Sequence, residues 1–265
     1  MSTTDNATEQ EQARIKAFFI AQRGYWRPWT DTMLQACPGF VAQYARYAGY
    51  PARTGPLSER MVELVYVALD ASGSHLFEAG LNTHMKRAIE VGASQADIFD
   101  VLHLVAVQGI ASACQATDIL AELTSPREAA QVDKALQARI DSLGPAHALS
   151  LASVAQLDAG YADVLLDFVE QGRPEAGLTP AERSIVQLAL HACFTAFNPA
   201  AVRQIVSTGL SQGSSPAQLL QAIQLGAHLA VHGSALGANA YRQLNDTGVT
   251  AQQAAKTAPF RPELP

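Results

Sequence analysis

Two histidines and several carboxylates lie close together in residues 57–109, a stretch whose pattern predicts three helices. Glu63 lies on the first of these helices, and His84 borders the apolar face of the second, where desolvation can move the pKa of a histidine through the physiological range. His75 lies in the break between the two helices, and Glu78 follows it closely enough to orient it or to accept a proton. These residue types favour general acid–base chemistry.

The same residues also fit purely structural roles. A histidine on an apolar helix face is more often a hydrogen-bonded core residue than a catalyst, and this interpretation is strongest for His103. Glu63 is also placed to form an ion pair with Arg60 or Arg87, which would need no substrate. The acid–base interpretation therefore depends on which side chains the fold brings together.

The stretch recurs 121 positions later without a gap, so that Leu57 matches Leu178 and Gly92 matches Gly213. Such internal repetition predicts two structural units of the same kind. The second copy keeps the apolar and glycine positions but loses the acid–base residues, which makes it a predicted structural partner of the first. In place of His75, Glu78, His84 and Glu63 it has Ala196, Pro199, Ile205 and Ser184.

The sequence contains little evidence of a metal site or a cofactor site. His228 and His232 are four residues apart on one predicted helix face, a spacing that can hold a metal, but no third ligand lies near them in the sequence. The chain has no Cys-x-x-Cys pair, no glycine-rich phosphate loop, no Gly-x-Ser-x-Gly and no His-Glu-x-x-His. We therefore expect no metal and no cofactor.

Composition limits the class of protein further. Alanine and leucine dominate and 48% of the residues are hydrophobic, which predicts a mostly helical chain with an ample core. The net charge of -6 without a basic cluster argues against nucleic acid as a partner. No apolar run approaches the roughly 20 residues of a membrane span, so we expect no membrane partner. Three widely spaced cysteines and a polar N-terminus predict a cytoplasmic protein.

The sequence predicts an all-α chain that consists of five parts. Both tryptophans lie near the end of an N-terminal helical arm, which predicts that the arm packs against other elements. A loop is expected over residues 50–56, and the last long helix is expected over residues 215–241. The predicted parts are the arm 1–29, the first repeat 30–125, a connector helix 126–150, a second, degenerate repeat 151–246 and an extended tail 247–265.

The order of helix, break, helix with an inward histidine, glycine turn and buried third helix resembles the carboxymuconolactone decarboxylase family, which includes the AhpD-like alkylhydroperoxidases. The segment ELVYVALDASGSHLFEAGLNTHMKRAIEVGAS, residues 63–94, carries this resemblance. It extends over residues 57–117 and, with less similarity, over residues 178–241. The resemblance implies an all-α fold of two tandem AhpD-like repeats. It also implies a homo-oligomer, with a trimer favoured for tandem members.

Peroxidase members of this family use Cys-x-x-Cys followed four residues later by histidine. His84 matches that histidine, but Phe77 and Gly80 occupy the two cysteine positions. Disulfide-based peroxidase chemistry needs the thiol pair, so the resemblance points to the decarboxylase members, which need none.

The function implied is a cofactor-independent lyase, a decarboxylase acting on a small carboxylated lactone or ring-derived acid from the degradation of aromatic compounds. His84 and His75 are the expected acid–base pair, which would protonate the carbon that CO₂ leaves. Glu63 and Glu78 would orient the two histidines and set their pKa values, and Arg87, one helical turn after His84, would hold the substrate carboxylate. The expected substrate-binding residues are Arg87, Phe77 and His103.

Two other functions stay open at the level of the sequence. The same histidines and carboxylates would serve a hydrolase, an isomerase or a dehydratase acting on a carbonyl compound. Alternatively, the repeat would act as a non-catalytic oligomeric scaffold or binding protein.

Overall fold

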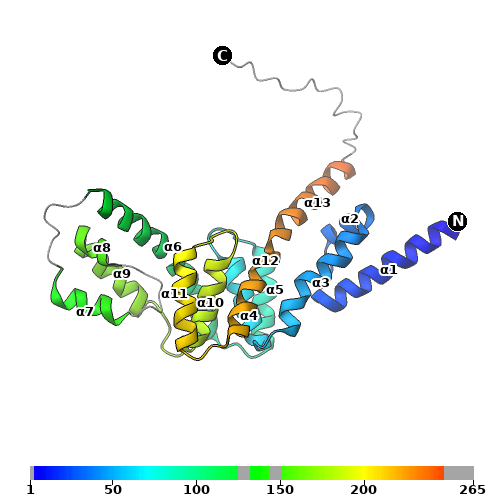
Figure 1. The fold of residues 1–265 in the computed structure, drawn as a ribbon. Helices are drawn as coiled ribbons and strands as arrows, with labels where there is room; N and C mark the ends of the chain where they lie inside the picture. The colour runs from blue at the N-terminus through cyan, green and yellow to red at the C-terminus, as the bar shows by residue number, and fades with distance from the viewer. Residues whose placement is uncertain (1–2, 125–131, 144–150, 248–265) are drawn as a thin grey trace, which may run out of the picture. The chain divides into compact units, whose positions relative to one another are not determined.

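The computed structural model describes residues 3–124, 132–143 and 151–247, and every regular element within these ranges is helical (Figure 1). The all-α prediction is therefore confirmed. The helices are α1 (Thr3–Arg23), α2 (Pro28–Ala36), α3 (Pro38–Thr54), α4 (Glu59–Ala71), α5 (Glu78–Glu90), α6 (Gln95–Thr124), α7 (Lys134–Ser142), α8 (Ala152–Leu157), α9 (Ala159–Gln171), α10 (Pro180–Ala192), α11 (Pro199–Ser211), α12 (Pro216–Ala227), the 3₁₀ helix η2 (His228–Ala230) and α13 (Val231–Asp246).

Contacts divide the chain into two compact units. One unit is Met1–Tyr50 with His228–Pro265, and the other is Pro51–Ala227. Helices from both ends of the chain thus contribute to the first unit, whereas the predicted parts were drawn on sequence repetition. The predicted boundaries of the arm, the repeats and the connector stay predictions.

The first unit has an aromatic core. Phe19 on α1 is fully buried, and its ring meets those of Trp29 and Tyr44 with centroids 6.2 and 6.3 Å apart. Val231 and Ala235 of α13 complete this core. Aromatic side chains bury large apolar areas, so this cluster explains why the arm holds both tryptophans, and the predicted packing of the arm is confirmed.

Two triplets of helices make up most of the second unit. The first triplet is α4, α5 and α6, the second is α10, α11 and α12, and α4 packs against α10 (Figure 1). The helices of each triplet follow one another in the same order, as the sequence repeat predicts.

Equivalent residues cap the first helix of each triplet and form the turn after its second helix. The side chains of Ser58 and Thr179 each cap a first helix by accepting the backbone N–H three residues later, at 3.3 Å. These bonds satisfy an amide that the helix leaves without an internal partner. Gly92 and Gly213 follow the second helices with φ of +92° and +91°, a conformation that L side chains rarely adopt. The local geometry is consistent with the internal repeat.

The two triplets are tied together by reciprocal hydrogen bonds. Asp100 on α6 accepts the backbone N–H of Leu178 at 2.9 Å, just before α10. Gln221 on α12, the equivalent position 121 residues later, accepts the N–H of Leu57 at 2.7 Å, just before α4. Each third helix therefore fixes the start of the other triplet's first helix. Asp100 also forms a buried ion pair with Arg183 on α10.

A further hydrogen bond joins equivalent residues directly. The hydroxyl of Ser74 donates to that of Thr195, its counterpart in the second copy, at 3.1 Å. Two equivalent residues can touch only where the rotation that relates the two copies passes close by. A pseudo-twofold relation between the two triplets would therefore place its axis near Ser74 and Thr195.

Helix α6 extends beyond its triplet and packs against α8. Val107 and Cys114 of α6 join Leu166 of α9 in a second apolar cluster. Among the described residues, α6 is the one helix long and apolar enough to cross a membrane, but half of its most apolar stretch is buried inside the protein. That burial is the usual state of a core helix in a globular domain.

Two local predictions are wrong. The loop expected over residues 50–56 is helical up to Thr54, because α3 continues through Pro51. The last long helix is interrupted by η2 and ends at Asp246, since Gly226 and Gly233 flank the interruption and glycine lowers helix propensity. Of the predicted connector helix, α7 is present, while residues 125–131 and 144–150 and the predicted tail 248–265 lie outside the described residues.

The buried pair of Asp100 and Arg183 yields a stability prediction. Asp100→Leu leaves the guanidinium of Arg183 buried without its counter-charge, so we expect the free energy of unfolding to fall by about 3–5 kcal/mol. Gln221→Leu is the matched control at the equivalent position, and it removes only neutral hydrogen bonds, at a cost of about 1–3 kcal/mol. Urea denaturation measures both, and equal losses would contradict a special role for the ion pair.

Candidate active site

The hairpin of α4 and α5 carries the predicted acid–base residues. The backbone N–H of Phe77, at the N-cap of α5, donates to the carbonyl of Asp70 on α4 at 2.9 Å and closes the break between the helices. A side-chain carbon at Gly80 would collide with the carboxylate of Asp70 and the ring of Phe77. Glycine at this position therefore allows α5 to approach α4 closely.

Glu63 and His84 meet between these two helices. Oε2 of Glu63 lies 2.6 Å from Nδ1 of His84, a distance typical of a charge-assisted hydrogen bond. Because the carboxylate can only accept, Nδ1 carries the proton in this pair. The side chains are 14% and 12% exposed, and the ring of Tyr66 lies 4.5 Å from the imidazole. The imidazole is thus held from two sides.

Arg87 lies beside the same carboxylate. Its Nη1 is 3.9 Å from Oε1 of Glu63, which is an ion-pair distance and too long for a direct hydrogen bond. The other predicted partner of Glu63, Arg60, instead binds Asp97 at 2.5 Å and Glu182 at 2.6 Å. The structure therefore brings Glu63, His84 and Arg87 together, with 31% of the Arg87 side chain exposed to a solute.

His75 has a different neighbour from the one expected. Its Nε2 lies 3.9 Å from Oδ1 of the buried Asp70, whereas Glu78 is exposed in the first turn of α5 and makes no contact with His75. This separation of His75 from Asp70 is too long for a hydrogen bond, and the expected orientation of His75 by Glu78 stays a prediction. Burial lowers the pKa of His75, which favours the neutral ring. The ring of Phe77 lies 6.1 Å from that of His75.

The break itself is strained. Leu76 has φ of +47°, and among the described residues it is the one non-glycine position in the left-handed region. A bulky side chain adopts this conformation at a cost, here with the backbone held by its N–H bond to the carbonyl of Ser72 at 2.9 Å. Its counterpart Phe197 is not left-handed. Strain of this kind is often found at functional sites, and here it occurs in the copy that has the acid–base residues.

His103, expected to bind substrate, occupies a packed position. Its Nε2 donates to the carbonyl of Phe168 on α9 at 3.0 Å, and the two rings are 5.4 Å apart. Burial lowers the pKa of His103. A contact of this residue with substrate stays a prediction, as do the catalytic roles of His75 and Glu78.

The cysteines do not form a thiol pair within the described part of the chain. Cys37 is exposed, and Cys114 and Cys193 are buried. Burial, aided by Asp118, raises the pKa of Cys114 to about 11, so this thiol stays protonated and unreactive at neutral pH.

His228, one of the two histidines at metal-binding spacing, is engaged inside the first unit. The guanidinium of Arg23 donates to its Nε2 at 3.3 Å, and the ring of Tyr44 lies 6.3 Å away. A nitrogen that accepts such a bond is a poor metal ligand, because both uses need the same lone pair.

Sequence reasoning gave no role to Tyr66 in the site. Tyr66 lies three residues after Glu63, so both side chains lie on the same side of α4. Asp70, seven residues after Glu63, is a candidate from the sequence on the same face of that helix, but without an assigned partner. The helical period could have placed both residues near the histidines, but not shown which histidine each one contacts.

Comparison with known proteins bears on the family resemblance and on the fold. Residues 38–122 match the sequence model of the carboxymuconolactone decarboxylase family, which confirms the resemblance seen in the sequence. A crystal structure from Burkholderia xenovorans LB400, of a protein provisionally named a γ-carboxymuconolactone decarboxylase subunit, has a TM-score of 0.81 and 20% identity, covering 89% of this chain and 98% of that one. At this identity the likeness establishes the fold alone. No curated protein sequence matches the chain.

The Glu63–His84 contact predicts the tautomer of the imidazole. With the carboxylate accepting from Nδ1, we expect the neutral ring of His84 to carry its proton on Nδ1. Long-range ¹H–¹⁵N spectra distinguish the two ring nitrogens, and Glu63→Ala should remove the preference for Nδ1. Glu78→Ala is the control and should leave the spectrum of His84 unchanged. A ring protonated on Nε2 in the unaltered protein would contradict the contact.

Proposed function

We propose that this chain is a cofactor-independent lyase, a decarboxylase of a small carboxylated lactone or related ring-derived acid. The observation that carries the proposal is the 2.6 Å contact of Glu63 with His84 on a hairpin that also presents Arg87. The family match over residues 38–122 supports the reaction class. We also propose that the protein is a cytoplasmic homo-oligomer, with a trimer favoured, that acts in the degradation of aromatic compounds.

The proposed reaction needs one proton at one carbon. The bond between the ring carbon and the carboxylate breaks, the electron pair passes into the conjugated carbonyl of the lactone, and CO₂ leaves. The carbon then takes a proton from Nε2 of the His84 imidazolium, because Nδ1 is engaged by Glu63. Water restores that proton to the ring, and the hydroxide left combines with the released CO₂ as bicarbonate. The carboxylate of Glu63 stabilises the positive charge that the imidazole carries before transfer.

Arg87 suits a carboxylate that stays on the substrate. A guanidinium that bound the departing carboxylate tightly would stabilise the ground state, which does not raise the rate. A second carboxylate, distant from the reacting carbon, would provide binding energy without this cost. The proposed substrate is therefore a lactone or ring-derived acid with two carboxylates.

Removal of His84 tests the chemistry. We expect His84→Gln to lower kcat for CO₂ release from γ-carboxymuconolactone by about 10²–10⁴-fold, the range of a lost general acid, with little change in the thermal midpoint. Lys86→Gln is the matched control, since this side chain is on the same helix and 77% exposed. A scaffold would leave no activity to lose, so the absence of CO₂ release from the unaltered protein with this lactone and with a panel of cyclic keto acids would overturn the proposal.

Substitution of Arg87 tests substrate binding separately. We expect Arg87→Gln to raise KM for the two-carboxylate lactone about tenfold or more, equivalent to about 1.4 kcal/mol of a charge-assisted contact, with a smaller effect on kcat. An ester of the second carboxylate should show the high KM with both proteins. A fall in kcat at constant KM would instead place Arg87 in the transition state.

A further inference from the structure

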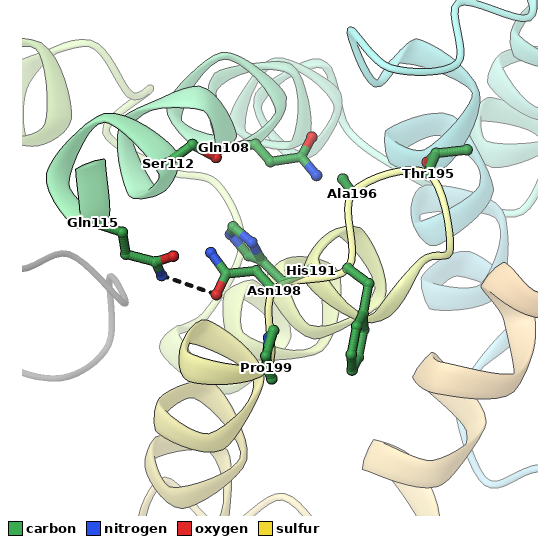
Figure 2. A pocket seen from close by; sticks show the side chains of 9 residues that line it. Gln108, Ser112, Gln115, His191, Thr195, Ala196, Asn198 and Pro199 are labelled. Carbon is green, nitrogen blue, oxygen red and sulfur yellow. Dashed lines mark hydrogen bonds between the residues drawn. The ribbon is translucent and has the colours of Figure 1, made fainter. Parts of the chain in front are cut away.

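A cavity of about 370 Å³ opens between α6 of the first copy and the segment of the second copy that leads into α11 (Figure 2). This volume falls within the range of small-molecule sites. All of its lining belongs to the second compact unit. The polar side chains that line it are Gln108, Ser112, Gln115, His191, Thr195 and Asn198.

No side chain that is charged at neutral pH lines this cavity. Its polar groups are three amides, two hydroxyls and one imidazole, and burial lowers the pKa of His191 to about 4, so that its ring is neutral at pH 7. An ionic ligand would lose its hydration here without gaining a counter-charge. The cavity therefore favours an uncharged ligand.

Two of the lining side chains are already hydrogen-bonded to other residues of the protein. Gln108 accepts from the hydroxyl of Ser72 at 3.1 Å and donates to the carbonyl of Leu190 at 3.0 Å. The hydroxyl of Thr195 accepts a hydrogen bond from that of Ser74. Their bonds fix the shape of the cavity and are not available to a ligand.

Other groups have bonding capacity that the protein does not use. His191 is 6% exposed, and within the described ranges its ring nitrogens have no hydrogen-bond partner, although Figure 2 shows the ring pointing into the cavity. Gln115 donates to Oδ1 of Asn198 at 2.9 Å, which leaves the carbonyl of Gln115 and the amino group of Asn198 to a ligand. A neutral imidazole donates one hydrogen bond and accepts one, so the His191 ring can bind a polar group of a ligand in the cavity.

The rim adds an apolar plane. Phe197 lines the cavity while 63% of the residue is exposed, so its ring can cover a flat ligand. We propose that this cavity is a second binding site, for a small uncharged ring compound that bears both a hydrogen-bond donor and an acceptor, such as a primary amide. The neutral imidazole of His191 and the amides of Gln115 and Asn198 would bind its polar end.

Part of this site corresponds in sequence to the break between α4 and α5 in the first copy. His191, Ala196 and Pro199 occupy the positions of Asp70, His75 and Glu78 in the first copy. The replacement of charged and basic groups by neutral ones suits binding without proton transfer. The proposal does not rest on the decarboxylase activity and would hold if the first site catalysed another reaction.

Benzamide and benzoate provide a matched pair of probes. They have the same ring and nearly the same size, but benzamide is uncharged and offers a donor and an acceptor, whereas benzoate is an anion at pH 7. Titration of the full-length protein, followed by NMR of the histidine ring signals and by ligand-observed saturation transfer, gives both dissociation constants. We expect benzamide to bind in the cavity at least tenfold more tightly than benzoate and to shift the signals of His191.

Two variants locate the binding. Ser112→Trp fills the cavity from α6 and should abolish benzamide binding, while Ala116→Trp, one turn further along the same helix at an exposed position outside the lining, should leave it unchanged. Gln115→Leu should weaken benzamide about fivefold or more without filling the cavity. Binding is assigned to this cavity only if Ser112→Trp removes it. This criterion distinguishes it from binding of benzoate at Arg87.

The outcomes decide the proposal. Selective, Ser112→Trp-sensitive binding of benzamide supports it. Benzoate binding more tightly in the cavity, benzamide binding that Ser112→Trp does not affect, or no benzamide binding at millimolar concentration would each overturn it.

Discussion

The structure of the helical repeat depends on how two backbone N–H groups are satisfied. Leu57 and Leu178 precede the first helix of each triplet, and their amides are accepted by Gln221 and Asp100 of the opposite triplet. An amide that loses its acceptor costs free energy, most where it is buried, so each triplet stabilises the start of the other's first helix. The position of α4, and with it of Glu63, is therefore set by the second copy even though that copy has lost the acid–base residues.

The sequence predicted the fold well where local signals determine structure. Caps at Ser58 and Thr179 and left-handed glycines at Gly92 and Gly213 follow from residue type and spacing. It failed at Pro51, where the continuing helix overrides the local preference of proline. The break in the last helix lies at glycines that lower helix propensity without fixing where a helix ends.

The candidate site could be predicted only in part. Arg87 is one of two partners expected for Glu63 from the sequence, and in the structure Glu63 lies beside both Arg87 and His84, with the ring of Tyr66 near that of His84. His75 lies 3.9 Å from Asp70, and its neighbour Leu76 adopts a left-handed conformation. No propensity predicts a leucine in the left-handed region, so the orientation of His75 could not have been read from the sequence.

The two copies differ most where they share the same geometry. The first copy places ionisable groups on the α4–α5 hairpin, whereas the second contributes His191, Thr195 and Asn198 to a cavity without charged side chains, where burial keeps His191 neutral. The same order of helices thus presents two electrostatic environments. This contrast explains why sequence repetition alone says little about function.

The hydrogen bond between Ser74 and Thr195 has a consequence for how such a chain can diversify. A hydroxyl both donates and accepts, so it can bond to its own counterpart across a twofold axis, which neither a carboxylate pair nor an ammonium pair can do without repulsion. This contact would therefore serve two identical halves equally well. Asp100 and Gln221 are equivalent positions that do not contact each other, and their residue types differ. A single continuous chain can therefore have an ion pair at one of these positions and a neutral amide at the other. An assembly of two identical halves cannot encode this asymmetry.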